Sequence, residues 1–228
     1  MSVSVGFLKK IQQWISDDSS EEILFLPFQT QGNPYKAKVL LAGAYPEPPI
    51  QVKEEDSQIL ADTLVDANLF QDLFQNEIST ASREYRGSLN FAAWGKEHLQ
   101  QQIVLSSINC LNVKSAQLKR LKKEDDPLYL KGFSIFEEVL NEFEPEVLVI
   151  QGSTAFKLFV DQFKDRLVDV EVDDLTMSVQ ALQQRGVIAK LCLNNGRNVN
   201  ILVSKSMATF GKEGKTFGEF KDILKQLL

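Results

Sequence analysis

The sequence is poor in the two residue types that most often build metal centres and nucleophilic catalytic sites. Its 228 residues include two cysteines and one histidine. Two thiols and one imidazole are too few for a usual zinc site or a four-cysteine cluster. A single histidine also argues against a Ser-His-Asp mechanism. We therefore expect neither a metal nor another cofactor.

Long apolar runs are missing as well. No stretch reaches the roughly 18 residues that a membrane-spanning helix needs, and lysines interrupt the apolar residues near the N-terminus, unlike a signal peptide. Cys110 and Cys192 both lie in apolar stretches, which is typical of buried, reduced thiols in the cytosol. The sequence thus predicts a cytoplasmic protein with no membrane partner.

The chain has no excess of positive charge. It carries 25 Lys and Arg against 31 Asp and Glu, a net charge of −6. Nucleic-acid-binding domains are often basic, but the field over one face matters more than the total. Basic residues gather at 114–123 and, more loosely, at 205–215. Each group is either a solvated surface or a contact for phosphates.

Apolar runs alternate with helical patterns along the chain. Strands are predicted at 38–43, 103–109, 147–150, 187–193 and 199–203, and helices at 5–16, 56–75, 91–101, 133–143, 152–163 and 217–228. Continuous apolar strands separated by helices are typical of a parallel sheet covered on both faces. We expect a single domain over 1–228, an α/β protein built as a three-layer α/β/α sandwich with a mainly parallel central sheet. Residues 1–34 are predicted to be an N-terminal helix and loop extension.

Three of the predicted strands end in residues suited to a ligand site. Two stop at Gly43 and just before Gly152, and a third stops at Asn109. Ligands in α/β sheets bind at the carboxyl ends of strands. The Asn109 amide either caps the loop that follows or offers a donor and an acceptor to a ligand. We expect the three strand ends to form edges of one pocket.

Four short motifs, in this order, resemble the uracil-DNA glycosylase superfamily. They are Gly43-Ala44-Tyr45-Pro46, Ile108-Asn109, Gly152-Ser153-Thr154-Ala155 and Val203-Ser204-Lys205-Ser206. The resemblance covers residues 35–228. It implies a uracil-DNA-glycosylase-like α/β/α sandwich that flips a nucleotide out of DNA and cleaves its N-glycosidic bond.

The resemblance also implies a role for each motif. Asn109, with Gly43, Ala44 and Tyr45, matches the residues that bind the base and hold the hydrolytic water. Gly152 and Ser153 match a turn that faces the pocket or a phosphate, and Ser204, Lys205 and Ser206 match a loop that presses on the DNA strand. As further DNA contacts we predict Lys114, Lys119 and Arg120 of the first basic group. The protein is expected to act on DNA as a monomer.

Three positions depart from the family pattern. Tyr45 stands where Asp or Asn is usual, Ala44 stands where one branch has Glu, and the 203–206 loop has no histidine. Cleavage through an oxocarbenium-like sugar needs a carboxylate or a polarised water. Glu47 is the carboxylate nearest to the changed motif, so it is either a catalytic residue or a solvent-exposed loop residue. Tyr45 is assigned to the catalytic corner, where it stacks on the base or walls the pocket.

The sequence therefore predicts a DNA glycosylase for a modified or otherwise non-standard pyrimidine. Some members of the similar superfamily excise glucosylated hydroxymethylcytosine from phage DNA, and this anti-phage role is one specific version. The alternatives are an inactive relative that binds nucleic acid or a protein, uracil excision in base repair, and an unrelated hydrolase. A carboxylate beside Asn109 in the pocket favours the glycosylase, and a pocket unrelated to Asn109 favours another hydrolase.

Overall fold

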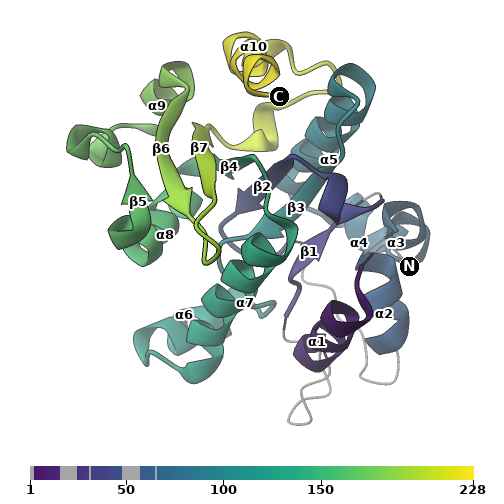
Figure 1. Cartoon of the computed structure of the whole chain (residues 1–228). Helices are drawn as coiled ribbons and strands as arrows, with labels where there is room; N and C mark the ends of the chain where they lie inside the picture. The colour runs from purple at the N-terminus through teal and green to yellow at the C-terminus, as the bar shows by residue number, and fades with distance from the viewer. Residues whose placement is uncertain (1–2, 16–24, 31, 48–56, 65) are drawn as a thin grey trace.

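A seven-stranded mixed sheet forms the centre of this α/β protein (Figure 1). The computed structural model describes residues 3–15, 25–30, 32–47, 57–64 and 66–228. The strand order is β1-β3-β2-β4-β7-β6-β5. The strands are β1 (Phe28–Gln29), β2 (Val39–Gly43), β3 (Ile103–Ser107), β4 (Val147–Gln151), β5 (Leu167–Val168), β6 (Val187–Cys192) and β7 (Asn198–Ser204).

The sheet is parallel only at its centre, which corrects the prediction of a mainly parallel sheet. The pairings of β3 with β2, β2 with β4 and β4 with β7 are parallel. The pairings of β1 with β3, β7 with β6 and β6 with β5 are antiparallel. The physical reason at one edge is the tight turn at 194–196, because strands joined by so short a connection can pair only as an antiparallel hairpin.

Helices connect these strands and follow most of the predicted helical patterns. They are α1 (Val5–Ile15), α2 (Ser57–Leu64), α3 (Ala67–Leu73), α4 (Gln75–Thr80), α5 (Arg83–Trp94), α6 (Ser115–Lys123), α7 (Pro127–Phe143), α8 (Gly152–Phe163), α9 (Val179–Arg185) and α10 (Gly218–Leu227). The single helix predicted at 56–75 is instead two helices, because Asp66 caps the start of α3 by accepting from the Asn68 and Leu69 amides. The helix predicted at 91–101 begins earlier, after the N-cap Ser82.

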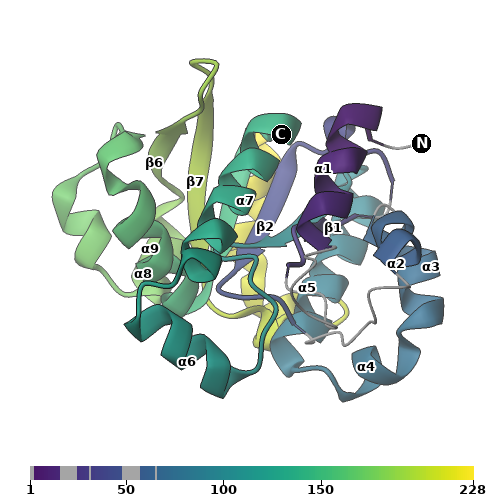
Figure 2. The same ribbon diagram turned by 90° about the horizontal axis from the view of Figure 1, so that it is seen from below.

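The buried strands divide their side chains between two apolar clusters. In β2, Leu40 and Ala42 join the cluster formed with α1, α7 and α8, whereas Val39 and Leu41 join the cluster formed with α5 and α10. Successive side chains of a strand point to opposite faces. Both faces of the sheet are therefore covered by helices, as Figures 1 and 2 show.

The N-terminal residues are integrated into the fold. Helix α1 buries Phe7 and Ile11 in the first of these clusters. The loop part of the predicted 1–34 extension contains β1, which pairs with β3 through Phe28 opposite Ser106 and Gln29 opposite Leu105. None of the described helices has the length and apolarity that crossing a bilayer requires.

Candidate functional site

A pocket lies at the carboxyl ends of three neighbouring parallel strands. Gly43, Ser107 and Gln151 are the last residues of β2, β3 and β4, and all three line it. The connection after β2 carries α5 on one face of the sheet, whereas α8 follows β4 on the other face. Such a divergence leaves a crevice between adjacent strands, which is where open α/β sheets bind ligands.

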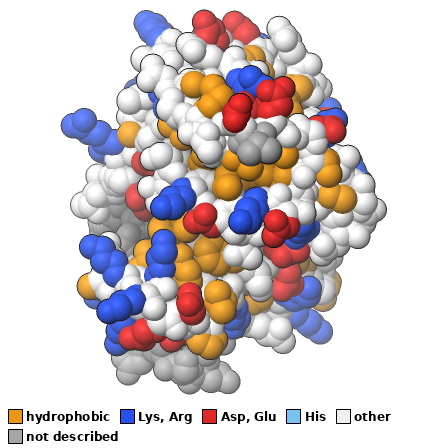
Figure 3. All heavy atoms as spheres, turned by 90° about the vertical axis from the view of Figure 1, so that its left-hand side faces the viewer, with side chains coloured by type: hydrophobic (Ala, Val, Ile, Leu, Met, Phe, Trp, Pro, Cys, Tyr) orange, Lys and Arg blue, Asp and Glu red, His pale blue; other side chains and the backbone are white. Residues whose placement is uncertain are grey.

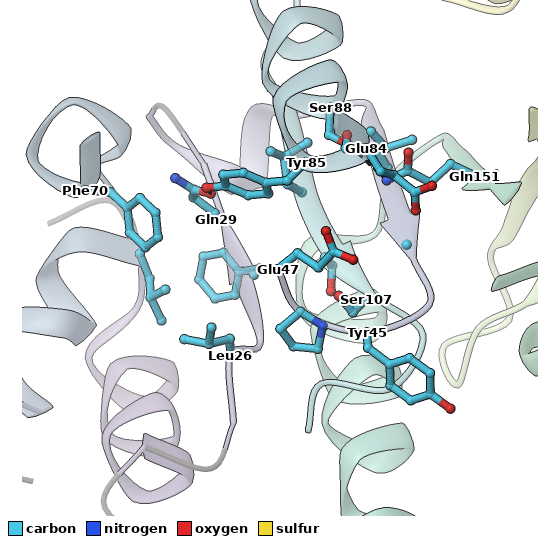
Figure 4. A pocket seen from close by; sticks show the side chains of 17 residues that line it. Leu26, Gln29, Tyr45, Glu47, Phe70, Glu84, Tyr85, Ser88, Ser107 and Gln151 are labelled. Carbon is cyan, nitrogen blue, oxygen red and sulfur yellow. Dashed lines mark hydrogen bonds between the residues drawn. The ribbon is translucent and has the colours of Figure 1, made fainter. Parts of the chain in front are cut away.

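The lining changes in character from one end of the pocket to the other. Figure 4 shows Phe70 and Gln29 at one end, Glu84 and Gln151 at the other, and Glu47 between them. The apolar part is formed by Leu26, Phe28, Leu64 and Phe70, together with the ring of Tyr85. The polar part is formed by Glu47, Glu84, Ser88, Ser107 and Gln151. The pocket can therefore hold a flat apolar ring beside a polar, reactive group.

Glu47 is the carboxylate that the sequence singled out, and it lines this pocket. It lies on the loop after β2, and its side chain reaches into the space between the two ends (Figure 4). The residue is exposed, and no described residue forms a hydrogen bond or an ion pair with its carboxylate. Both oxygens are free to accept a proton or to face a positive charge.

Glu84 is a second carboxylate in the pocket, and sequence reasoning missed it because the start of α5 was not recognised. The signal was Ser82, whose hydroxyl caps the helix by accepting from the Tyr85 amide at 3.0 Å. The Glu84 carboxylate accepts a short hydrogen bond from the Ser206 hydroxyl. The Gly152 motif also lies beside Glu84, because a Cβ added to Gly152 would be 4.0 Å from Glu84 Oε2. The predicted Gly152 and Ser206 motifs therefore meet at this carboxylate.

Gly152 and its neighbour Gln151 shape this polar end. The Gly152 φ angle of 81° lies in the left-handed region, where glycine is favoured. The Gln151 side chain donates to Ser88 Oγ at 2.9 Å and accepts from the Met207 amide at 3.2 Å. Gln151 thereby connects α5 to the loop after β7.

Asn109 is not brought into the pocket. Strand β3 ends at Ser107 rather than at Asn109, and the Asn109 side chain is completely buried. Its Nδ2 donates to the Tyr129 carbonyl at 2.9 Å, and its Oδ1 accepts from the Leu111 amide at 3.0 Å. A Cβ at Gly132 of α7 would overlap Oδ1, so the amide is packed tightly against that helix. This is the geometry of an asparagine that caps its own loop.

The other residues of the Gly43 motif lie at or near the pocket wall. Tyr45 lines the pocket, but its ring turns away from the other labelled side chains, and its hydroxyl lies 3.4 Å from the Tyr129 hydroxyl (Figure 4). Burial raises the pKa of Tyr129 above its ordinary value, and the Tyr45 contact adds to this shift. The Ala44 carbonyl accepts a hydrogen bond from the backbone N–H of Asn109 at 3.2 Å. Tyr45 thus closes one side of the pocket rather than crossing it.

The predicted DNA contacts are dispersed. Ser204 is completely buried, and Lys205 places its ammonium 4.7 Å from the Phe217 ring centre while donating to the Thr216 carbonyl. Ser153 is exposed in the first turn of α8. Lys114, Lys119 and Arg120 are exposed at α6 and do not line the pocket.

No lysine or arginine is among the described residues that line the pocket. Two exposed arginines that sequence reasoning missed, Arg83 and Arg86, flank Glu84 and Tyr85 on α5. Neither forms an ion pair with a described residue. On the face around β5 and α9, basic and acidic side chains are interspersed with apolar ones (Figure 3), and ion pairs such as Lys190–Asp169 neutralise part of the charge. That face therefore offers no continuous basic stripe to a nucleic acid.

Metal ligands do not gather in the part of the chain that the structure describes, where no group of three or more His, Cys, Asp and Glu could hold an ion.

No protein-family model matches this chain, and no curated protein matches it significantly.

Proposed function

We propose that this protein is a DNA glycosylase with a uracil-DNA-glycosylase-like α/β/α fold, which hydrolyses the N-glycosidic bond of a flipped-out modified pyrimidine. One observation carries the proposal. Glu47, the carboxylate nominated from the sequence, lines a pocket at the ends of β2, β3 and β4 and has no partner among the described residues. Glycoside hydrolysis uses carboxylates beside the scissile bond, and Glu47 can supply one of them.

The chemistry needs one water molecule and no other reactant. As the bond between the base and C1′ lengthens, its electron pair leaves with the base and the sugar becomes oxocarbenium-like. Glu47 faces this positive charge and accepts a proton from the attacking water, whose oxygen bonds to C1′. The proton passes to the departing base, so the products are a neutral base and an abasic sugar.

The rest of the pocket supports a flipped-out base. The apolar side chains of Leu26, Phe28 and Phe70 and the ring of Tyr85 line one end of the pocket and would supply the stacking surface that flipped bases use. Arg83 and Arg86 lie on the helix that carries Glu84 and can contact the flanking phosphates. Because Tyr45 replaces the usual acidic or amide residue and turns its ring aside, we expect a modified pyrimidine to be preferred over uracil.

The test is mass spectrometry of bases released from phage DNA that contains glucosylated hydroxymethylcytosine and from uracil-containing DNA. Glu47→Gln should lower the rate of release by about 100-fold or more. The matched control is Glu97→Gln, since Glu97 is an exposed carboxylate outside the pocket. If no base is released from either DNA, or if Glu47→Gln is as fast as the wild type, the proposal is wrong.

A hydrolase for small neutral N-glycosides is the second candidate. It is favoured by the absence of Lys and Arg from the described lining and by the burial of Asn109 outside the pocket. The same assay with free pyrimidine nucleosides separates the two candidates. Faster release from nucleosides than from DNA would favour the second.

A further inference from the structure

One polar group at the apolar end of the pocket is left without a partner. Gln29 of β1 is only 7% exposed and lines the pocket. Its Oε1 accepts from the Tyr85 hydroxyl at 2.8 Å, but its Nε2 has no hydrogen-bond partner. Most buried polar groups in folded proteins are satisfied, so an unsatisfied amide in a pocket needs an explanation.

The contact with Tyr85 orients the amide. Burial raises the pKa of Tyr85 well above its ordinary value, so the hydroxyl keeps its proton and acts as a donor. A donating hydroxyl faces the oxygen of an amide rather than its nitrogen. The amide nitrogen of Gln29 is thereby left with free hydrogens.

The surroundings limit what can satisfy that nitrogen. The side chains of Leu26, Phe28, Leu64 and Phe70, which also line this part of the pocket, offer no acceptor. Figure 4 shows Gln29 on the side of Glu47 opposite to Glu84 and Gln151. A ring bound at this end therefore presents its far edge to Gln29 while its glycosidic bond faces Glu47.

We propose that Gln29 Nε2 donates a hydrogen bond to a ring carbonyl oxygen of the bound base, which makes Gln29 a base-binding residue of the pocket. This inference rests on the proposed function in so far as the ligand is a nucleobase. The substrates would then be bases with a carbonyl group, as uracil-type and cytosine-type pyrimidines have.

The experiment measures binding of free bases and requires no cleavage. Uracil and cytosine are titrated into the full chain and into its Gln29→Met variant, and NMR chemical shifts report their dissociation constants. Both bases should bind the wild type about tenfold more tightly than they bind Gln29→Met, because a hydrogen bond of about 1.4 kcal/mol corresponds to a factor of ten. Gln29→Met keeps the length of the side chain and removes the donor.

Two variants separate recognition from damage to the fold. Thr30 also has a buried hydroxyl without a partner, but it does not line the pocket, so Thr30→Val should bind both bases as the wild type does. Tyr85→Phe keeps the ring and the Gln29 donor but removes the hydroxyl that orients the Gln29 amide. It should weaken uracil binding less than Gln29→Met does. Thermal unfolding of each variant shows whether it is folded.

The outcomes are distinct from those of the release assay. Unchanged affinity of folded Gln29→Met for uracil and cytosine, or no binding of either base by the wild type, would overturn the role of Gln29. If both bases bind through Gln29 but no base is released from DNA, Gln29 keeps its role and the glycosylase proposal fails.

Discussion

The first residues after β2 and after β3 leave the same edge of the sheet but lie in opposite environments. The loop after β2 carries Glu47 into the pocket, with a free carboxylate. The loop after β3 turns into the protein, where Asn109 is completely buried and uses both ends of its amide. Both follow buried parallel strands, and both showed a polar residue where ligands usually bind.

The residues beyond each strand explain the difference. After Asn109, Cys110 and Leu111 are buried, the Cys110 amide donates to the Gly132 carbonyl, and Leu111 forms a bridge to Phe25. These contacts draw the loop into the core, where an amide must find internal partners. After Gly43, Pro46 has no amide hydrogen to donate and Glu47 is a charged residue, so Glu47 stays at the surface. A polar residue at a strand end is therefore a poor guide to a site unless the residues after it are considered.

The largest expected effect is the difference in unfolding free energy between a substitution in the buried loop and one in the exposed loop. Asn109→Ala leaves the Leu111 amide unpaired in the core, removes a side-chain donor to the Tyr129 carbonyl, and should lower the free energy of unfolding by about 2–4 kcal/mol. Glu47→Ala, in the exposed loop, should change it by less than about 0.5 kcal/mol. Urea unfolding followed by circular dichroism measures both. Equal losses in the two variants would contradict the contrast between the loops.

A smaller effect is expected in DNA binding, because each loop has its own neighbouring basic group. Arg83 and Arg86 lie on the helix that lines the pocket, whereas Lys119 and Arg120 lie on α6, beyond the buried loop. The double variant Arg83→Gln/Arg86→Gln should lose about tenfold in affinity for a short duplex at low salt, with a weaker salt dependence. Lys119→Gln/Arg120→Gln is the matched control and should lose less than about threefold. Fluorescence anisotropy measures both, and the reverse ranking would move the DNA path to α6.

The mildest test leaves the chain unmutated and uses the cysteine of the buried loop as a probe. Cys110 is buried, and burial raises its thiol pKa from 9.0 to about 12, whereas Cys192 is only half-buried. Since the thiolate is the reactive form, a thiol reagent at pH 8 should modify Cys192 and leave Cys110 intact until the protein is unfolded. Mass spectrometry after digestion identifies the labelled residue. Rapid labelling of Cys110 in the native protein would mean that the loop after β3 opens.

Much of the frame was predictable because its signals are local. The apolar runs that became β2 and β4 end within one residue of the predicted positions. Glu47 could be nominated because it directly follows the Gly43-Ala44-Tyr45-Pro46 motif. Glu84, Tyr85 and Gln29 could not, since each comes from a segment that carries no motif and reaches the pocket only through the packing of α5 and the edge pairing of β1. The mixed character of the sheet was missed because an apolar run does not encode the direction of its neighbours.

The sequence by itself determined the α/β class, the central strands, and the strand end that presents a carboxylate. Those properties follow from apolar runs, helical periodicity and chain breaks, which act within a few residues. Only the tertiary structure decided which polar groups share a pocket. Asn109 and Glu47 have similar local signals, but one is satisfied by α7 and the other faces open space. Partnering of a buried polar group depends on contacts between distant segments, and no local pattern specifies these.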